Sequence, residues 1–509
     1  MEDNAAVKGG GKWRLVQFLV AFHAVVLCLL VHASLFSTMS APYGAATGLF
    51  RPGGVAGNEE EQGGGALAAL DNQMGSPCSA LRNHSICCDR SDDNADVCFM
   101  SGDVRTDAAS LSLLLFPPAT AAGGAHAAEE ERIRPYTRKW DGKVMGKIPE
   151  VRLRVARPEE AAAGRHQCDV RHDAPVHVVA AAGGYNHNYF HAFNDGFLPS
   201  WLTVQHLRRR VMLAALSYSQ PWASKYAEVI AGLSAYPVVD LLRDTRTHCF
   251  PGAIVGTRFH GYLAVDPARL RDGKTIVDFH HFLAGVYEPS SQGGGSSSEP
   301  EIVAQQRPPL RPRLGIVSRR GTRVIENEAA VAHLAASSGF DVGVLETGGA
   351  AAAARPLSEL YASVRGYDAL VGVHGSDLTS FLFLRPGHGV LAQVAPLGVT
   401  ELSRDLFGAP AASMGLHYEQ YDVLGRESSL SRRYSPRHVV VADPERAKRR
   451  KGSTMDGDWD RDFIGRVYLG GQNVSLDLDR FGKTLARMRS RLLREQESQV
   501  ASADALARV

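Results

Sequence analysis

The sequence predicts an α/β protein in which two Rossmann-like domains face a cleft, preceded by a transmembrane helix and a stem. Three observations lead to this prediction. An uncharged apolar run lies near the N-terminus, β-like and helix-like segments alternate after about residue 171, and a stretch rich in Ser, Gly and Pro divides that alternation into two halves. The chain of 509 residues is long enough for two or three domains. Strands alternating with helices are typical of parallel sheets covered on both faces.

The apolar run, residues 15–36, contains no Asp, Glu, Lys or Arg and is long enough to cross a bilayer as a helix of about 20 residues. Three basic residues precede it and none follows until Arg51, so the positive-inside rule places residues 1–14 in the cytoplasm and the remainder in the lumen. A cleaved signal peptide is the alternative; we favour an anchor because the run exceeds the ~7–15 residues of a signal core. Residues 37–76, rich in Gly and Ala, are then a flexible stem.

The lumenal part is predicted to begin with a cysteine-containing region, residues 77–170. Six cysteines lie beyond the apolar run, at positions 78, 87, 88, 98, 168 and 249. An even number in a secretory compartment favours disulfides, whose pairing cannot be derived from the sequence. Zinc binding by the first four is the alternative, but their spacing matches no C-x-x-C pair. Asn83 and Asn473 stand in N-glycosylation sequons, which a lumenal location makes usable.

Residues 171–289 are predicted to form the first Rossmann-like domain. A β-like run at 176–182 ends at two glycines, and residues 188–207 have helical spacing that is interrupted or restarted at Pro199. Further apolar segments follow at residues 236–242, 253–257 and 276–286.

A linker at residues 290–312, with a Ser/Gly run and several prolines, leads to the second domain, residues 313–480. Strands are expected there at residues 313–318, 341–345, 369–373 and 389–395, and helices at residues 327–338 and 356–364. A C-terminal helix is expected over residues 481–509.

The strand at 369–373 ends in His374-Gly375, after which Ser376 and Asp377 are suited to cap a short apolar helix. At the carboxyl edge of a parallel sheet, such a turn offers free backbone N–H groups and the positive end of a helix dipole to an anionic ligand. We interpret it as the floor of a nucleotide-sugar site. The alternative is an ordinary strand-to-helix turn in which His374 is packed and hydrogen-bonded.

The strand at 313–318 leads into a second candidate turn. It carries hydroxyl and guanidinium groups that suit a pyrophosphate: Ser318, Arg319, Arg320, Thr322 and Arg323. A solvated basic turn is the alternative. Because the carboxyl ends of parallel strands share one sheet edge, we expect this turn to converge with His374, Gly375 and Thr379 on one phosphate site.

In the first half, His191 and Asp195 stand four residues apart and so share a helical face. A carboxylate or imidazole facing the cleft can take the proton from an attacking sugar hydroxyl. The alternative is that the two side chains only hydrogen-bond each other and a neighbouring loop.

Other signals exclude some classes of function. The net charge is +2 and basic residues are spread along the chain, which does not indicate a nucleic-acid partner. Overlapping D-x-D patterns between Asp456 and Asp462 follow a basic loop rather than a strand, so we assign them to a surface loop and expect no bound metal. The phosphate-binding motif G-x-x-x-x-G-K-[ST] and the G-x-S-x-G elbow are absent.

Four segments now carry a resemblance to a known family. They are SGDVRTD (101–107), GGYNHNYFHAFNDGFLP (183–199), RPRLGIVSRRGTRVIEN (311–327) and GVHGSDLTSFLFLRPG (372–387). In this order they resemble the plant branch of glycosyltransferase family 61. The last segment departs from that family's usual HGAGLTN pattern at Ser376, Asp377 and Ser380 and keeps His374 and Thr379.

The resemblance implies a single-pass type II Golgi membrane enzyme of the GT-B type, inverting and without a bound metal or other cofactor. Its donor would be a UDP-pentose, carrying xylose or arabinofuranose, and its acceptor the side positions of xylan. Arg319, Arg320 and residues 374–379 would hold UDP, and the region of Asp195, in the first domain, would face the acceptor. Two alternatives stay open: an N-glycan core β1,2-xylosyltransferase, and a catalytically silent sugar-binding scaffold for other Golgi glycosyltransferases.

Overall fold

The computed structural model describes residues 70–117, 130–157, 159–160, 164–288, 311–347, 355–449 and 461–506. The expected cytoplasmic tail, membrane helix and most of the stem lie outside these ranges, as do most of the linker and most of the D-x-D segment. Within the described residues, no helix combines the length and the hydropathy that a membrane span requires.

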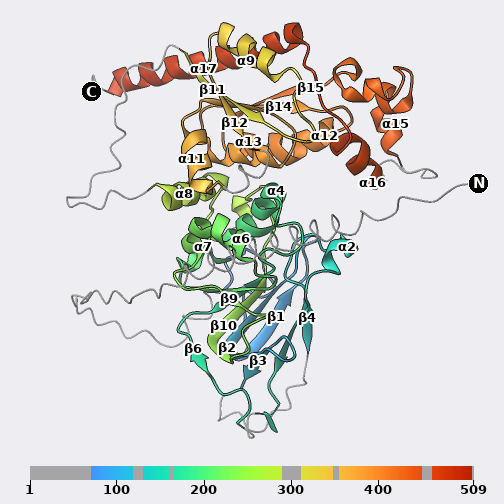
Figure 1. The fold of residues 1–509 in the computed structure, drawn as a ribbon. Helices are drawn as coiled ribbons and strands as arrows, with labels where there is room; N and C mark the ends of the chain where they lie inside the picture. The colour runs from blue at the N-terminus through green and yellow to red at the C-terminus, as the bar shows by residue number, and fades with distance from the viewer. Residues whose placement is uncertain are drawn as a thin grey trace, which may run out of the picture. The chain divides into compact units, whose positions relative to one another are not determined.

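The described residues of the first half build a ten-stranded sheet with the order β4-β5-β3-β2-β10-β7-β8-β9, in which β1 pairs with β2 and β6 with β10 (Figure 1). The strands are β1 (Ser85–Asp89), β2 (Val97–Asp107), β3 (Ser112–Phe116), β4 (Glu131–Ile133), β5 (Val151–Val155), β6 (Val170–Arg171), β7 (Val176–Val179), β8 (Met212–Ala215), β9 (Val239–Asp240) and β10 (His248–Gly256).

This sheet corrects the expectation of a purely parallel first domain. β10, β7, β8 and β9 do run parallel to one another. However, β2 pairs antiparallel with β10, with Phe99 opposite Ile254, and so joins residues on both sides of the boundary expected at residue 170. β7 pairs with one edge of β10, and the long strand β2 pairs with the other. Without β2, the backbone N–H and C=O groups of that second edge would be unpaired.

The six cysteines predicted to form disulfides do so, in the pairs Cys78–Cys87, Cys88–Cys98 and Cys168–Cys249. The zinc alternative is therefore wrong, because each of these sulfurs is bonded to another sulfur. Cys88–Cys98 links β1 to β2, and Cys168–Cys249 links the segment before β6 to β10.

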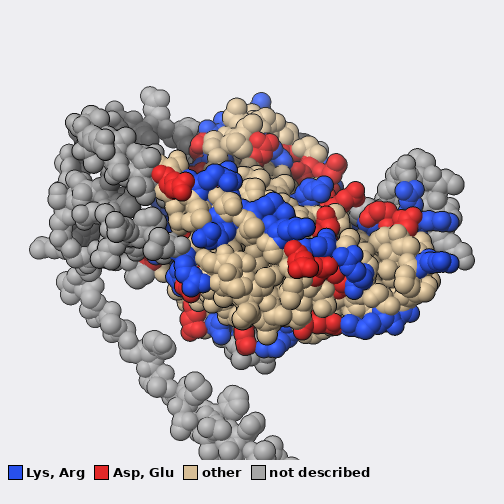
Figure 2. All heavy atoms as spheres, turned by 90° about the horizontal axis from the view of Figure 1, so that it is seen from above, with Lys and Arg blue, Asp and Glu red and all other residues tan. Residues whose placement is uncertain are grey.

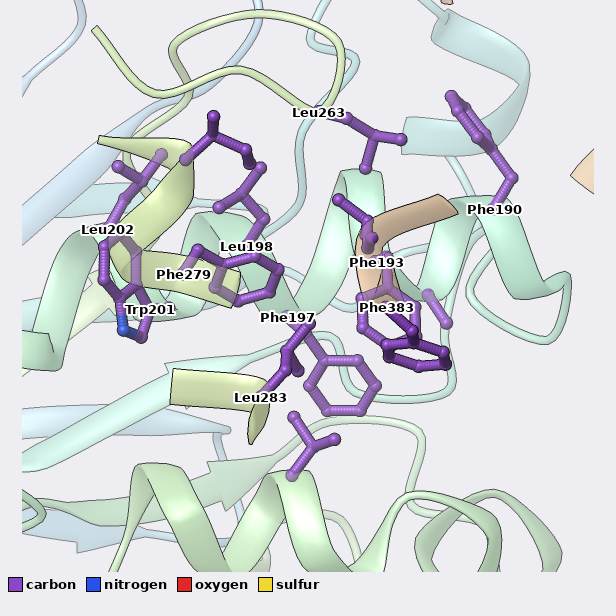
Figure 3. Packing of buried hydrophobic residues seen from close by; sticks show 14 of the residues in the cluster. Phe190, Phe193, Phe197, Leu198, Trp201, Leu202, Leu263, Phe279, Leu283 and Phe383 are labelled. Carbon is purple, nitrogen blue, oxygen red and sulfur yellow. The ribbon is translucent and has the colours of Figure 1, made fainter. Parts of the chain in front are cut away.

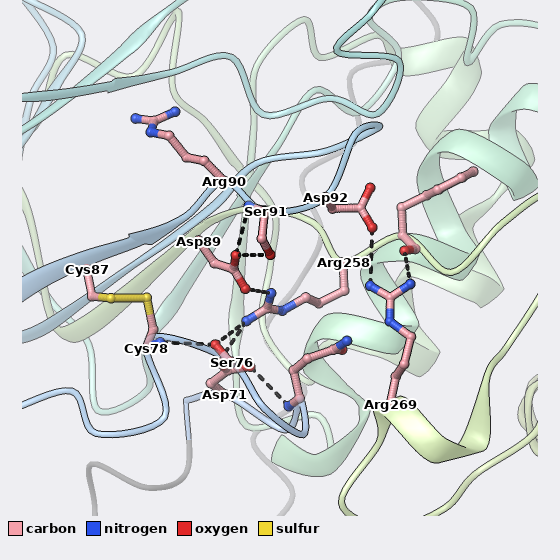
Figure 4. A network of polar contacts seen from close by, with 12 residues as sticks. Asp71, Ser76, Cys78, Cys87, Asp89, Arg90, Ser91, Asp92, Arg258 and Arg269 are labelled. Carbon is pink, nitrogen blue, oxygen red and sulfur yellow. Dashed lines mark hydrogen bonds and ion pairs between the residues drawn. A yellow bond between two sulfur atoms is a disulfide. The ribbon is translucent and has the colours of Figure 1, made fainter.

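A buried arginine anchors the first described residues to this sheet (Figure 4). The guanidinium of Arg258 lies 2.5 Å from Asp89 Oδ2 and 2.7 Å from Asp71 Oδ2, and it donates to Ser76 Oγ at 2.9 Å. A buried charge is tolerated only when it is paired and hydrogen-bonded. Arg258 therefore connects residues 71–76 to β1.

The second sheet is entirely parallel and has the order β12-β11-β13-β14-β15. Its strands are β11 (Arg313–Ser318), β12 (Asp341–Glu346), β13 (Ala369–Val373), β14 (Val390–Ala395) and β15 (His417–Asp422). The first four confirm the strands predicted from apolar runs. β13 is buried along its whole length, as expected for a central strand of a parallel sheet.

Helices cover both faces of the second sheet (Figure 1). α9 (Glu328–Ser337) and α17 (Leu478–Leu506) pack on one face, where Val331 and Phe481 join a core with Val371. α11 (Leu357–Arg365) and α13 (Ala409–Ser413) pack on the other, where Tyr361 and Ala411 join Leu370. The predicted helices at 327–338 and 356–364 are thus confirmed within two residues.

Between Asn188 and Leu207 the chain is helical, as predicted. α4 (Tyr189–His191) begins at Asn188, whose side chain accepts from the backbone N–H groups of Phe190 and His191. A π-helical turn, η1 (Ala192–Phe197), leads into α5 (Leu198–Val204). Pro199 lies just after the π-helical turn, and the helix continues through it without a break.

Further helices connect these elements. They include α2 (Gly142–Met145), α6 (Gln220–Lys225), α7 (Ala227–Leu233), α8 (Ile276–Tyr287), α12 (Thr400–Ser403), α14 (Val439–Ala442), α15 (Pro444–Lys448), α16 (Arg461–Phe463) and the 3₁₀-helix η4 (Ser376–Phe383).

An aromatic core joins η1, α8 and η4 (Figure 3). The ring centre of Phe193 lies 6.4 Å from that of Phe279 in α8 and 6.3 Å from that of Phe383 in η4. Nδ1 of His280 also lies 2.8 Å from the Leu382 carbonyl oxygen. Edge-to-face aromatic contacts of this kind add to the burial of large apolar surfaces. They hold α4 and η4, which carry candidate residues from the two halves, in direct contact.

Candidate active site

The strand order of the second sheet determines where a ligand can bind. β12 and β11 lie on one side and β13, β14 and β15 on the other, so the chain reverses direction across the sheet between β11 and β13. Ligands of open parallel sheets bind at such a switch point, outside the carboxyl ends of the strands. β11 ends at Ser318 and β13 ends at Val373. The two predicted turns therefore begin side by side.

Side chains from the two turns meet. Arg319 Nη1 lies 2.5 Å from Asp377 Oδ2, and Arg323 Nη1 donates to the His374 carbonyl oxygen at 3.0 Å. A Cβ atom on Gly375 would lie 2.5 Å from Arg319 Nη1, so only glycine permits this approach. The structure thus brings together Arg319, His374 and Gly375 as expected.

The start of η4 differs from the prediction. Ser376 and Asp377 do not cap the helix; they are its first two residues, and Gly375, which has no side chain, occupies the cap position. The Asp377 carboxylate pairs with Arg319 instead, and Ser376 Oγ lies 3.3 Å from Asp377 Oδ1. A helix without a side-chain cap leaves its first N–H groups available to a ligand.

His374 is fully buried and neutral. Burial and then the charges of Arg323 and Arg319 lower its pKa to about 3. The Gln393 amide nitrogen lies 2.8 Å from Nδ1. With Nδ1 accepting from this amide, the proton of the neutral ring is on Nε2, which is then a hydrogen-bond donor.

Arg323 adds a second buried cation. Burial, followed by the charge of Arg319, lowers its pKa to about 10, so the guanidinium stays charged near neutral pH. Its Nε is buried and has no hydrogen-bond partner within the described residues. Two guanidinium groups against the single carboxylate of Asp377 leave a positive excess, which suits an anionic ligand.

The other predicted phosphate-binding residues are placed differently. Arg320 turns outward, is 62% exposed and pairs with Glu346 at 2.9 Å, because neighbouring residues of an extended segment point to opposite sides. Ser318 Oγ donates to Glu328 at 2.9 Å. The carbonyl of half-buried Thr322 accepts from Arg319 Nε at 3.5 Å. Thr379 is fully buried, and its hydroxyl has no partner in the described ranges.

Sequence reasoning missed a third cation, Lys225, at the end of α6. Burial lowers its pKa, and the Asp377 carboxylate partly opposes that effect, so the two groups are close. Its Nζ lies 5.8 Å from the ring centre of Tyr189 and 5.7 Å from that of Tyr226. Lys225 precedes Asp377 by more than 150 residues, and no motif links them. Only the tertiary structure reveals it, through the interaction of Lys225 with Asp377.

His191 and Asp195 hydrogen-bond each other and a residue of a neighbouring loop, which is the arrangement that the alternative interpretation predicted. His191 Nδ1 lies 2.7 Å from Asp195 Oδ2. Arg138, which sequence reasoning missed, donates from Nε to the same oxygen at 2.7 Å, and its Nη2 lies 3.0 Å from His191 Nδ1. Tyr136 donates its hydroxyl to Asp195 Oδ2 at 2.9 Å.

This arrangement makes Asp195 a weak base. Burial alone would raise its pKa, but the hydrogen bond from His191 and the charge of Arg138 outweigh burial and lower the pKa to about 2. The carboxylate is almost fully buried, whereas the His191 side chain is 24% exposed. Because Nδ1 is engaged, Nε2 is the atom of His191 that a ligand can use.

A single aromatic side chain connects this pair to the switch point. The ring of Phe407 lies 5.5 Å from that of Phe190, next to His191, and 5.5 Å from that of His374. The His191–Asp195 pair and the cationic turns therefore belong to one packed region.

The two predicted glycosylation sites differ. Asn83 is exposed in a turn before β1. Asn473 is half-buried, and its Oδ1 accepts from the Val324 backbone N–H at 3.2 Å. Its side chain also donates to Glu326, whose pKa is lowered chiefly by Arg432. The geometry therefore suits modification of Asn83 and not of Asn473.

A protein metal site needs several donor side chains gathered at one place. Across the described ranges, no three His, Cys, Asp or Glu side chains are grouped so as to hold a metal ion. Most of the D-x-D segment lies outside these ranges. Its last residue, Asp462, is exposed and lies 3.7 Å from Lys143.

A cationic turn at the switch point of a parallel sheet, with a His–Asp pair packed against it, is typical of enzymes that bind a phosphate-bearing ligand. Comparison with known proteins defines this class further. The family model described as Glycosyltransferase 61 matches residues 189–391.

Curated relatives extend the match. Xylan glycosyltransferase MUCI21 of Arabidopsis thaliana is 36% identical over 419 residues, covering 82% of this chain and 81% of that protein. β-1,2-Xylosyltransferase XYXT1 of Oryza sativa subsp. japonica is 34% identical over 412 residues, covering 79% and 83%. α-1,3-Arabinosyltransferase XAT3 of the same organism is 33% identical over 395 residues, covering 77% and 63%. The chain belongs to glycosyltransferase family 61 and is a glycosyltransferase.

Proposed function

We propose that the chain transfers a pentose, xylose or arabinofuranose, from a UDP-sugar to side positions of xylan. The names of its relatives, a xylan glycosyltransferase, a xylosyltransferase and an arabinosyltransferase, support this substrate class. We further propose a type II protein of the Golgi membrane with its catalytic part in the lumen and a GT-B arrangement. The three disulfides support a secretory compartment, and the two α/β units with a switch point in the second support the arrangement. On the face seen in Figure 2, basic and acidic side chains are interspersed, which favours a carbohydrate over a nucleic acid.

In this proposal the diphosphate of the donor lies between the two turns. Arg319, Arg323 and Lys225 would balance its charge, and His374 would donate from Nε2 as a neutral group. The uncapped start of η4 would add backbone N–H groups. Cations and dipoles placed in advance stabilise the charge that develops on a leaving diphosphate, so the proposal assigns no step to a resident metal ion.

The proposed reaction is a single displacement. The acceptor hydroxyl oxygen bonds to the anomeric carbon while the bond from that carbon to the phosphate oxygen breaks, and UDP leaves with the bonding electrons. The hydroxyl proton passes to Nε2 of His191, and the configuration of the sugar inverts. Asp195, held ionised by Arg138, would orient the imidazole and stabilise the imidazolium. This assigns the base to His191 and makes Asp195 a positioning residue.

One observation carries the proposal: α4, which bears His191, packs directly on η4, whose first residues contact Arg319. A base and a phosphate-binding site from distant parts of the chain are thereby neighbours. A general base must lie within hydrogen-bond reach of the proton that it removes.

The test is the release of UDP by the purified full-length chain, given UDP-xylose or UDP-arabinofuranose together with xylohexaose. We expect acceptor-dependent release that falls at least about 100-fold in His191→Ala, a typical contribution of a general base. Asp195→Asn should lower kcat with little change in donor KM. Acceptor-dependent release in both variants, equal to that of the unmodified chain, would refute the base assignment.

The same assay distinguishes an active transferase from the alternative of a catalytically silent sugar-binding scaffold. The observation favouring that alternative is the ion pair of Asp377 with Arg319, which partly neutralises the cation nearest the turn. A silent protein would bind xylohexaose and UDP but release no UDP from a UDP-sugar. Transfer to an N-glycan acceptor and not to xylohexaose would favour the N-glycan xylosyltransferase instead.

A further inference from the structure

Few aromatic side chains are exposed in the described residues. Three of the exposed large hydrophobic side chains in this part of the chain are aromatic: Trp140 (42% exposed), Tyr185 (36%) and Tyr262 (39%). They come from three different loops, before α2, after β7 and after β10. Exposed apolar surface that gathers in this way marks a binding site more often than chance exposure does.

Trp140 and Tyr185 flank Arg138, and Tyr262 lies within electrostatic reach of it. The Cζ atom of Arg138 lies 5.6 Å from the ring centre of Trp140 and 5.5 Å from that of Tyr185. The pKa of Arg138 is raised overall: burial lowers it, but the Asp195 carboxylate and smaller contributions outweigh burial. Tyr262 is one of these smaller contributions. Arg138 has a left-handed backbone, with φ of 79°, a conformation that costs free energy in a residue with a side chain. Strain of this kind is common at functional sites.

The polar edges of these rings are already held. Trp140 Nε1 donates to Asn94 Oδ1 at 3.0 Å, and the Tyr185 hydroxyl donates to Asp141 Oδ2 at 3.3 Å. The backbone N–H of Tyr185 donates to the Tyr136 hydroxyl at 2.9 Å, the same hydroxyl that donates to Asp195. The rings of Trp140 and Tyr185 are thus fixed before any ligand binds, which reduces the entropy lost on binding.

The cluster adjoins the proposed base. The ring centre of Tyr185 lies 5.0 Å from that of His191. A ligand that lies on Tyr185 therefore reaches the imidazole that would remove its proton.

We propose that Trp140, Tyr185 and Tyr262 form a stacking platform for the pyranose rings of a polysaccharide acceptor. This inference rests on the proposed function, because it assigns the acceptor subsite of that reaction. The C–H bonds on the face of a pyranose pack on aromatic rings, while its hydroxyls need polar partners at the rim. Charged groups next to these rings include the guanidiniums of Arg461, whose Cζ lies over the Trp140 ring at 4.4 Å from its centre, and of Arg138. A lipid surface is disfavoured by these charged groups.

The experiment measures the affinity of the purified full-length chain for xylohexaose, cellohexaose and mannohexaose, and separately for UDP. We expect Trp140→Ala and Tyr185→Ala to raise the Kd for xylohexaose at least about tenfold and to leave the Kd for UDP unchanged. Trp140→Phe, which retains a ring, should recover most of the affinity. Leu242→Ala, at an exposed apolar position after β9, is the matched control and should bind as the unmodified chain does.

The outcomes separate the two proposals. Unchanged xylohexaose binding in the alanine variants would overturn the platform and leave the transferase proposal standing. Binding of cellohexaose or mannohexaose alone, lost in the alanine variants, would support the platform and reject xylan as acceptor. Failure of the unmodified chain to bind any of the three oligosaccharides would overturn the platform.

Discussion

Arg319, Arg320 and Arg323 occupy one short turn but have three different environments. Arg319 pairs with Asp377, Arg323 is buried against the backbone of His374, and Arg320 faces solvent beside Glu346. Residue type alone cannot distinguish them, because each offers the same guanidinium fork. Burial decides which arginine is best suited to bind a phosphate, since a charge acts more strongly on a ligand where water is excluded.

At this scale we predict that Arg323→Ala lowers kcat/KM for UDP release by about 100- to 1000-fold, the usual cost of removing one donor to a developing charge. Arg320→Ala should change it by less than about twofold, because an exposed ion pair contributes little. Steady-state kinetics with UDP-xylose and xylohexaose check both. Equal losses in the two variants would contradict the assignment of Arg323 to the phosphate site.

His191 and Asp195 show a similar division of labour. The pair is spaced for one helical face, and the structure adds Arg138, which keeps Asp195 ionised and thereby unsuited to take a proton. Without Arg138, the sequence favours Asp195 as the base. With it, the more exposed imidazole is the better candidate.

The element that organises the site is the β13–turn–η4 unit. Its strand was predictable because five apolar residues end at His374-Gly375, and its helix was predictable in position. The 3₁₀ geometry and the absence of a side-chain cap were not predictable. Asp377 bonds to a distant arginine rather than to its own backbone, so a tertiary contact overrides the local preference for capping.

Gly375 is the point of closest approach in this unit. We predict that Gly375→Ala weakens UDP binding at least about tenfold, because the added Cβ would displace the Arg319 guanidinium. Isothermal titration with UDP measures the effect. Gly285→Ala in α8 is the control, since its Cβ would meet nothing within 4 Å and alanine favours a helix. Unaltered UDP affinity in Gly375→Ala would show that Arg319 does not contact the diphosphate.

For the whole molecule, two fully buried histidines make stability depend on pH. Burial lowers the pKa of His177 to about 4, and burial with the nearby arginines lowers that of His374 to about 3, from the ordinary 6.5. Below pH 6.5 the unfolded chain therefore binds more protons than the folded one. Stability is at its full value above 6.5 and falls as the pH approaches 4, by about 1.4 kcal/mol per pH unit for each histidine.

We therefore predict that the unfolding temperature of the full-length chain falls steadily between pH 6.5 and about 4.5. His177→Leu, which removes one of the buried imidazoles outside the phosphate site, should make that fall shallower. His333→Gln, at an exposed position of α9, should leave the slope unaltered. An identical slope in all three proteins would mean that the buried histidines do not control acid stability. Differential scanning fluorimetry across the pH series provides the comparison.

The sequence by itself determined the α/β class, the strands of the second sheet, the disulfide-bonded state of six cysteines and the glycosyltransferase family. These follow from apolar periodicity, turn residues and motifs, which are local or repeated in relatives. Tertiary structure alone decided the mixed first sheet, the outward direction of Arg320, the burial of Arg323, and the positions of Lys225, Arg138 and the aromatic platform. Those features depend on contacts between residues far apart in the chain, and no local pattern encodes which distant side chain will occupy a given space.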